Sequence, residues 1–164
     1  MTQNTNLIPL TQGQVAIVDA TDYEWLSQRK WYALRNKWGF YAVREEYIGS
    51  GKTRFIYMHR QIMDAPKGMQ VDHANGDKLD NRRANLRLCT NAENSRNSTS
   101  RKGSSSAYLG VCWDKQHGKW LAKIRIDGRT KHLGRYETEI DAAMIYDAAA
   151  RIHHGKFANP NFPE

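Results

Sequence analysis

Apolar and polar residues alternate in several stretches of the first 57 positions, as they do in β-strands with one buried face. Residues 14–18 are one example. The turn residues at 49–52 precede a further strand at 53–58, which predicts a hairpin. Residues 22–30 favour a short helix that interrupts the sheet. We therefore expect a small β-rich subdomain whose core includes three tryptophans, Trp25, Trp31 and Trp38.

The pattern changes in the middle of the chain, which is rich in His, Asn, Asp and Arg. Residues 69–73 predict a short strand, and the turn-forming residues at 74–84 predict a long loop. Residues 85–88 predict a second strand. Thr90 and Glu93 have the spacing of a capping box, so we expect a helix to begin at Thr90. The predicted order is strand, long loop, strand, helix.

A serine-rich stretch at 98–106 reads as a flexible tether with two positive charges. Beyond it, three segments predict strands, and Asp127-Gly128 is a hairpin signal between the last two. Their ranges are 109–113, 120–126 and 129–135. A helix is predicted over 139–153, with Thr138 as its N-cap and Gly155 as its C-terminal stop. Its expected apolar face comprises Ala142, Ala143, Ile145, Tyr146, Ala149 and Ile152.

Together these patterns predict an α+β protein in four parts. A small N-terminal β-sheet subdomain (1–57) leads into the strand–loop–strand–helix core (58–97). A basic linker (98–106) then joins a three-stranded antiparallel sheet packed on one helix (107–164). Because side chains alternate along a strand, Lys123 and Arg125 share the face that the helix leaves open.

The charge of the chain favours a polyanionic partner. The net charge is +8, with a pI of about 9.6, which favours nucleic acid first and an acidic membrane second. Seven Lys or Arg and one acid lie between Lys115 and Arg135, whereas residues 137–147 carry four acids and no base. The basic stretch is therefore expected to face an anion, and the acidic stretch to face solvent. No apolar run approaches the roughly 20 residues that span a bilayer, so we expect no membrane association.

The cysteines and the N-terminus argue against zinc-binding, disulfide-linked and secreted proteins. Cys89 and Cys112 stand alone without a CxxC pair, which argues against a structural zinc site and a disulfide framework. Any bound metal would have oxygen and nitrogen ligands. Residues 1–9 are polar and uncharged, unlike a secretory signal, so an intracellular protein is expected.

Four polar residues of the middle region carry candidate chemistry. Phosphodiester hydrolysis needs a base for water and a divalent cation for the leaving oxygen. Asp72 and the amide oxygen of Asn94 suit a hard cation such as Mg²⁺. His73 must point to the opposite side of the strand from Asp72, so one side chain can hold metal while the other meets water. Asn85 can hydrogen-bond His73 or its loop.

This region resembles the HNH endonucleases, in particular the phage homing enzymes of the H-N-N variety. The resemblance rests on 71–73 (VDH), 75–77 (NGD), 80–82 (DNR), 85–87 (NLR) and 94–97 (NSRN), and on His59-Arg60 upstream. It implies a ββα-metal (His-Me finger) core. His73 would be the general base, Asn85 its orienter, and Asp72 and Asn94 the ligands of Mg²⁺ or Mn²⁺. The last motif position is Asn rather than His. From the residues themselves, Asn75, Asn81 and Asn91 read as turn or cap residues, and His59 as a phosphate contact or a structural histidine.

The C-terminal part is similar to the APETALA-two DNA-binding domain of plant ethylene-response factors, which also occurs in phage HNH enzymes. The match rests on segments such as 108–111 (YLGV), 118–120 (GKW), 133–134 (LG), 142–143 (AA), 146–149 (YDAA) and 161–163 (NFP). Leu109, Cys112, Thr130 and His132 stand where the plant proteins place base-reading residues, so the resemblance implies DNA contact by a site-preferring enzyme but does not indicate which sequence is preferred. The expected DNA contacts are Arg82, Arg83, Arg87, Arg96, Trp113, Lys115, Lys119, Lys123, Arg125 and Arg135.

The sequence thus predicts a metal-dependent endonuclease that binds double-stranded DNA. One base and one cation serve one strand, so we expect a monomer that nicks. The resemblance implies a phage-encoded enzyme acting in the cytoplasm of a bacterial host. Two alternatives stay open: a DNA-binding regulator with a vestigial HNH region, and a protein that binds or cuts RNA.

Overall fold

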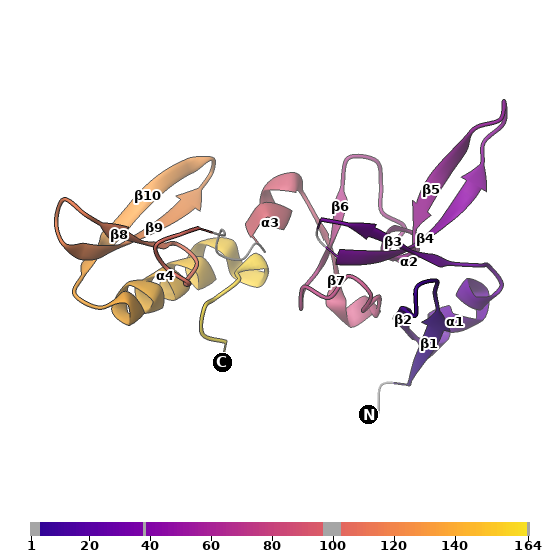
Figure 1. Cartoon of the computed structure of the whole chain (residues 1–164), viewed down its shortest axis with the longest axis horizontal. Coiled ribbons are helices and arrows are strands. Elements are labelled where there is room, and N and C mark those ends of the chain that lie inside the picture. The colour runs from indigo at the N-terminus through magenta and orange to yellow at the C-terminus, as the bar shows by residue number, and fades with distance from the viewer. Residues whose placement is uncertain (1–3, 38, 97–102, 164) are drawn as a thin grey trace. The chain divides into compact units, whose positions relative to one another are not determined.

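The computed structural model describes residues 4–37, 39–96 and 103–163 (Figure 1). Trp38, which was expected in the core, lies outside the described residues, as do Asn97 and the 98–102 portion of the predicted linker. The chain divides into two compact units, Met1–Asn94 and Ser95–Glu164. Both contain small antiparallel sheets and helices, which agrees with a mixed α/β architecture. None of the described helices is long and apolar enough to cross a membrane.

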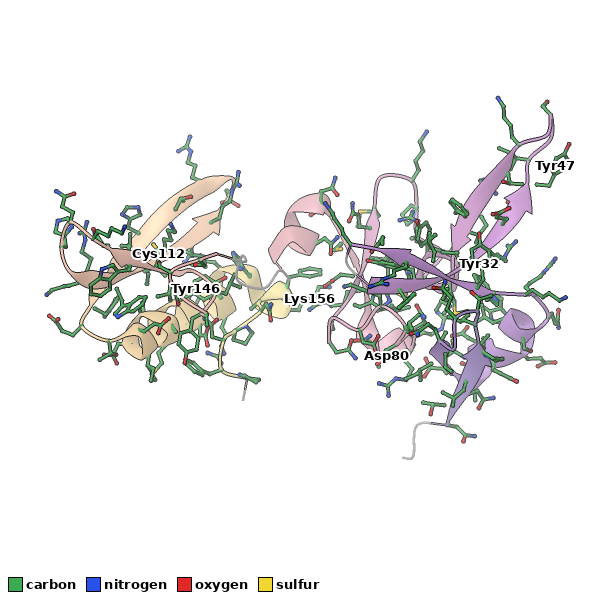
Figure 2. All side chains as sticks on the ribbon, in the orientation of Figure 1. Tyr32, Tyr47, Asp80, Cys112, Tyr146 and Lys156 are labelled. Atoms are coloured by element: carbon green, nitrogen blue, oxygen red, sulfur yellow. The ribbon has the colours of Figure 1, made fainter. Side chains whose placement is uncertain are left out.

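The first unit opens with a β-hairpin, a helix and a three-stranded sheet of order β3-β4-β5. These elements are β1 (Thr5–Pro9), β2 (Val15–Asp19), α1 (Ala20–Ser27), β3 (Tyr32–Asn36), β4 (Gly39–Tyr47) and β5 (Thr53–Tyr57). The hairpin predicted between the last two strands is confirmed. Figure 2 shows Tyr47 near the far end of this hairpin, where 69% of its surface is exposed.

The predicted order of strand, long loop, strand and helix is confirmed in the second half of this unit. Its elements are α2 (Met58–Ile62), β6 (Gln70–His73), η1 (Arg83–Asn85), β7 (Leu86–Cys89) and α3 (Asn91–Arg96). Strands β6 and β7 pair antiparallel. The expectation that Asn85 begins the second strand is wrong. Asn85 ends a single 3₁₀ turn, because its side chain is used to close the loop.

One hydrophobic core joins the N-terminal strands to the region of α2, β6 and β7, so the boundary expected between residues 57 and 58 does not separate two cores. Its buried members are Ile8, Ala16, Val18, Leu26, Trp31, Ala42, Met58, Ile62, Val71 and Leu86. The backbone of Ile17 on β2 also pairs with the loop, accepting from the Asn81 N–H at 2.8 Å and donating to the Leu79 carbonyl at 2.9 Å. The N-terminal sheet therefore supports the loop that follows β6.

The second unit is a three-stranded antiparallel sheet of order β10-β9-β8 with one long helix, as predicted. Its elements are β8 (Val111–Asp114), β9 (Lys119–Ile126), β10 (Arg129–Tyr136), α4 (Glu139–His154) and η2 (Gly155–Phe157). Thr138 caps α4 by accepting the Asp141 N–H at 3.1 Å, and Gly155 ends it, as expected.

The face of α4 that packs on the sheet differs in part from the predicted one. Ala142, Tyr146 and Ala150, spaced by four, are buried. Ile145 and Ile152 are 39% and 78% exposed, so their assignment to the buried face was wrong. Small residues on the buried side let the helix lie close to the sheet. Tyr146, labelled in Figure 2, packs on Gly110, where an added Cβ would lie 1.9 Å from the ring.

The tether ends earlier than predicted. The Ser105 hydroxyl accepts the Trp113 N–H at 2.9 Å, and the Ser106 hydroxyl accepts the Tyr108 N–H at 3.0 Å. Ser106 is buried. Composition alone suggested flexibility here, but these hydroxyls satisfy backbone donors of the C-terminal unit. They therefore belong to that unit rather than to a linker.

Candidate active site

His73 is fixed at the end of β6 by a hydrogen bond to Asn81, which was expected only as a turn or cap residue. Its ring is 1% exposed, and Nε2 lies 3.3 Å from Oδ1 of Asn81. The Asn81 amide nitrogen donates to the Leu79 carbonyl at 3.1 Å, so its oxygen is the atom that faces the imidazole. The Nε2 atom of His73 must then carry the hydrogen, which places the ring's lone pair on Nδ1.

The surroundings of His73 keep its imidazole neutral. Burial, the largest cause, lowers the pKa of His73 to about 4, and the positive charge of Lys78 acts in the same direction. The Asn81 hydrogen bond and the Asp72 and Asp77 carboxylates oppose this effect without reversing it. A neutral imidazole is able to accept a proton at neutral pH. The residue therefore has the protonation state that a general base needs.

Asn85 closes the loop between β6 and β7 rather than contacting the imidazole directly. Its Oδ1 atom accepts the Asn75 N–H at 3.0 Å, and its Nδ2 atom donates to the Asp80 carbonyl at 2.7 Å. Of the two roles expected for Asn85, the structure shows the loop contact. Asn81 contacts the ring instead. No local sequence signal indicates this contact, because an Asn eight residues after a His in a turn-rich loop has many possible partners.

Asp72 points to the other side of β6. It is 2% exposed and forms an ion pair with Arg87, its cross-strand partner on β7. Only 17% of the Arg87 side chain is exposed. The Arg87 guanidinium, which was expected to contact DNA, is therefore paired with Asp72. The Asp72 carboxylate is the group that was expected to bind a cation.

Asn94 lies beside the same face of β6 as Asp72. Its Nδ2 atom donates to Oε1 of Gln70, and Gln70 shares a face with Asp72 because the two are separated by two positions on the strand. The predicted capping box places Asn94 here. The Thr90 N–H donates to the Glu93 carboxylate at 2.8 Å, and the Thr90 hydroxyl accepts the Glu93 N–H at 3.3 Å. The predicted capping box of Thr90 and Glu93 is therefore confirmed.

The chemistry of these donors suits a hard divalent cation. A carboxylate oxygen and an amide oxygen on one side of β6 are ligands that Mg²⁺ or Mn²⁺ accepts, with water completing the coordination. The Asn94 hydrogen bond to Gln70 uses the amide nitrogen, so its oxygen is the atom able to bind a cation. Within the described ranges, no group of three or more His, Cys, Asp or Glu gathers as a metal cluster. Asp72 and Asn94 are thus the residues that would hold such a cation, with water as its other ligands.

Two arginines that were expected to contact DNA form ion pairs that hold the loop between β6 and β7 in place. Arg82 binds Asp80 through Nε at 2.7 Å and Nη2 at 2.6 Å. Arg83 binds Asp22 of α1 at 2.7 and 2.8 Å. The Arg82 hydrogen bond is the largest cause that lowers the pKa of Asp80. Their side chains remain 32% and 53% exposed, so each can also face a phosphate.

The open face of the C-terminal sheet carries the expected cations. Lys123 and Arg125 are exposed on β9, opposite His132 and Thr130 of β10. Arg135 shares this face and binds Asp114 at 2.7 Å, which lowers the pKa of Asp114 to about 2. These residues form a basic face that the helix does not cover.

The other expected DNA contacts differ in their surroundings. Lys115 is exposed, and Lys119 pairs with Glu137 at 2.7 Å. Trp113 pairs in register with Trp120, on the opposite face from Lys123, and is 40% exposed. The side chain of Arg96 lies outside the described part of the structure.

Comparison with known proteins places these observations in a family. The profile described as HNH endonuclease matches residues 64–96, which include β6, β7 and α3. The chain is 33% identical over 150 residues to "Uncharacterized HNH endonuclease L560" of Acanthamoeba polyphaga mimivirus, covering 92% of this chain and 76% of that protein. It is 30% identical over 105 residues to "Protein 3.8" of Escherichia phage T7, covering 61% and 86% respectively.

A third relative is of a different kind. The chain is 42% identical over 65 residues to "Dehydration-responsive element-binding protein 2A" of Oryza sativa subsp. indica, covering 38% of this chain and 23% of that protein. No solved structure matches the chain. The mimivirus protein matches over nearly the whole chain, and the HNH endonuclease profile falls on the strand–loop–strand–helix core. The chain therefore belongs to the HNH endonuclease family.

Proposed function

We propose that the protein is a metal-dependent endonuclease that hydrolyses one strand of duplex DNA. The observation that supports this most strongly is that the two sides of β6 carry different chemical groups. A neutral imidazole with its lone pair on Nδ1 lies on one side, and oxygen donors suited to a divalent cation lie on the other. General-base catalysis and metal-ion catalysis of phosphodiester hydrolysis need these two groups near one phosphate.

In this proposal His73 accepts a proton at Nδ1 from the water that attacks phosphorus. Asn81 holds the ring so that Nδ1, rather than Nε2, meets the water. Asn85 fixes the loop that carries Asn81. A divalent cation, Mg²⁺ or Mn²⁺, bound by Asp72 and Asn94 would stabilise the negative charge on the leaving oxygen. The phosphodiester bond breaks, and the hydroxyl from water ends on phosphorus.

Capture of DNA is assigned to the basic face of the C-terminal sheet. Lys123, Arg125 and Arg135 present positive charge on strands that are not covered by α4. Neutralising phosphates in this way supplies affinity that is largely independent of sequence. The similarity to a protein named for element binding supports this assignment. Arg82, Arg83, Arg87, Arg96, Lys115, Lys119 and Trp113 remain proposed contacts.

A monomer with one such centre cuts one strand per engagement, so the proposed product is a nick. The relative from phage T7 supports a phage-encoded enzyme, which would act in the cytoplasm of a bacterial host. A supercoiled plasmid carrying the target site tests the proposal. In Mg²⁺ or Mn²⁺ the wild type should convert it first to the open circle. Direct linearisation at low enzyme concentration would overturn nicking by a monomer.

The rival function is a DNA-binding regulator that does not cut. It predicts retention of the plasmid in a gel-shift assay, with no open circle formed in either metal. RNA is separated from DNA by competition, because a duplex DNA competitor should suppress cleavage more strongly than RNA does. The presence of all four residues Asp72, His73, Asn85 and Asn94 supports the nuclease.

A further inference from the structure

His59, on α2, lies against the proposed general base. The centroids of its ring and the His73 ring are 5.0 Å apart, and the rings meet edge to face at 70°. Tyr41 of β4 and Tyr57 of β5 pack on His59 at centroid distances of 5.6 and 5.5 Å. The two histidines therefore come together in the folded chain from positions 14 residues apart. His59 is therefore a direct neighbour of the proposed general base.

The polarity of His59 is unexplained by its packing. The residue is 7% exposed, and its Nδ1 atom is buried without a hydrogen-bond partner among the described residues. Buried polar atoms are nearly always hydrogen-bonded, and one that is not calls for a functional explanation or an additional ligand. A phenylalanine would fill the same aromatic cluster without this penalty. The nitrogen is therefore expected to serve a state of the protein that includes a further polar group.

The charges around His59 indicate the kind of group. Burial is the main reason that the pKa of His59 falls to about 3, and the positive charges of Arg60 and Lys78, together with His73, lower it further. Lys78 acts on His73 in the same way. Two nearby side chains, Arg60 and Lys78, thus place positive charge close to a neutral imidazole. A neutral imidazole beside cations is suited to hydrogen-bond an oxygen of an anionic group rather than to bind as a cation itself.

From this geometry we infer that His59 is a second imidazole of the reaction centre. It hydrogen-bonds an oxygen of the phosphodiester while water attacks the phosphorus. This inference rests on the proposed function, since it assigns His59 to the same centre as His73. It also gives the N-terminal sheet a role, because β4 and β5 supply the rings that hold His59 in place.

The test compares His59→Phe with the full-length wild type under single-turnover conditions in Mn²⁺. Phe keeps the ring and removes both nitrogens. The expected result is a cleavage rate lower by on the order of 100-fold, the usual loss when one hydrogen bond to the reacting group is removed. DNA affinity should not change, and the thermal midpoint should equal or exceed that of the wild type. His59→Asn, which restores a polar atom at the δ position, should cleave faster than His59→Phe.

Tyr57→Phe is the matched control, because it removes a polar atom from the same aromatic cluster and should cleave at the wild-type rate. Wild-type cleavage by His59→Phe would overturn the inference. A parallel fall in cleavage, DNA affinity and thermal midpoint would also overturn it, since that outcome marks a purely structural residue. If the wild type itself does not cut, the proposed function fails and this inference fails with it. If the wild type cuts DNA and His59→Phe cuts it at the same rate, the inference about His59 fails while the proposed function stands.

Discussion

Asp72 and Arg87 stand directly opposite each other on β6 and β7, and their side chains form a nearly buried ion pair. The proposed cation would bind the same carboxylate. A guanidinium and a divalent cation that share one carboxylate repel each other, so each weakens the binding of the other. In the free protein, Arg87 keeps Asp72 from being an unpaired buried charge.

The first prediction concerns this competition. Replacing Arg87 by Gln removes the competing positive charge, and Mn²⁺ should bind roughly 3- to 10-fold more tightly, which is about 1 kcal/mol, the size of a partly screened charge interaction. Isothermal titration calorimetry of the full chain measures this. Asp72→Asn is the control and should abolish the binding. Weaker Mn²⁺ binding by the Arg87 variant would contradict competition between Arg87 and the cation for Asp72.

The second prediction concerns the tautomer of His73. Asn81→Leu keeps the side-chain volume but leaves Nε2–H without its acceptor, so the lone pair is no longer fixed on Nδ1. We expect kcat to fall by on the order of 10- to 100-fold with KM little changed, as for other residues that orient a catalytic histidine. Asn81→Asp keeps an acceptor and should lie between the two. A KM effect with unchanged kcat would assign Asn81 to DNA binding instead.

The third prediction concerns stability at acid pH. The folded-state pKa values of His59 and His73 are about 3 and about 4, below the value of 6.5 expected when unfolded. The unfolded chain therefore takes up more protons as the pH falls below about 6.5. The stabilisation from neutral burial is complete above that pH and is lost as the pH falls to about 4 for His73 and about 3 for His59. Between pH 7 and 5, each histidine should remove about 2 kcal/mol from the free energy of unfolding.

Urea titration at each pH measures this loss, in the presence of a chelator so that metal binding does not contribute. His59→Phe removes one of the two groups, so its loss between pH 7 and 5 should be smaller than that of the wild type. Identical pH profiles for the two proteins would contradict neutral burial of His59. Carboxylate protonation affects both proteins alike and cancels in the comparison.

The fourth prediction concerns the basic face of the C-terminal sheet. Lys123→Ala combined with Arg125→Ala should weaken duplex binding at least about 10-fold near 0.1 M salt, and should reduce the slope of log affinity against log salt by about 2. Arg129→Ala with Lys131→Ala removes the same charge from residues that pair with Ile126 and Ile124, on the other face. The control should lose less. Equal losses would mean that only net charge matters.

The sequence predicted most elements of the fold because their signals are local. The capping box of Thr90 and Glu93 and the N-cap at Thr138 each depend on residues three positions apart, and both are present in the structure. Ile145 and Ile152 were misassigned because α4 packs mainly through alanines, and hydrophobicity alone does not favour Ala over Ile. Small size decides which face approaches a sheet.

The candidate site was harder to predict where it depends on long-range contacts. Asp72, His73 and Asn94 stood out by residue type and spacing, and their catalytic roles remain predictions. Asn81 was read as a turn or cap residue, and His59 as a phosphate contact or a structural histidine, so neither was linked to His73. Their importance arises from contacts with His73 that only the folded loop and α2 create. Likewise, Arg82 and Arg83 read as DNA contacts, whereas the structure shows them bound to Asp80 and Asp22.

The proposed roles of His73 and Asp72 are tested by the single-turnover rate of DNA cleavage by His73→Ala and Asp72→Asn, measured beside duplex affinity. We predict that the wild type nicks DNA only when Mg²⁺ or Mn²⁺ is present. Both variants should lose cleavage by at least about 100-fold while binding DNA as tightly as the wild type. Cleavage by His73→Ala at the wild-type rate, or wild-type cleavage that persists in a chelator, would contradict the account.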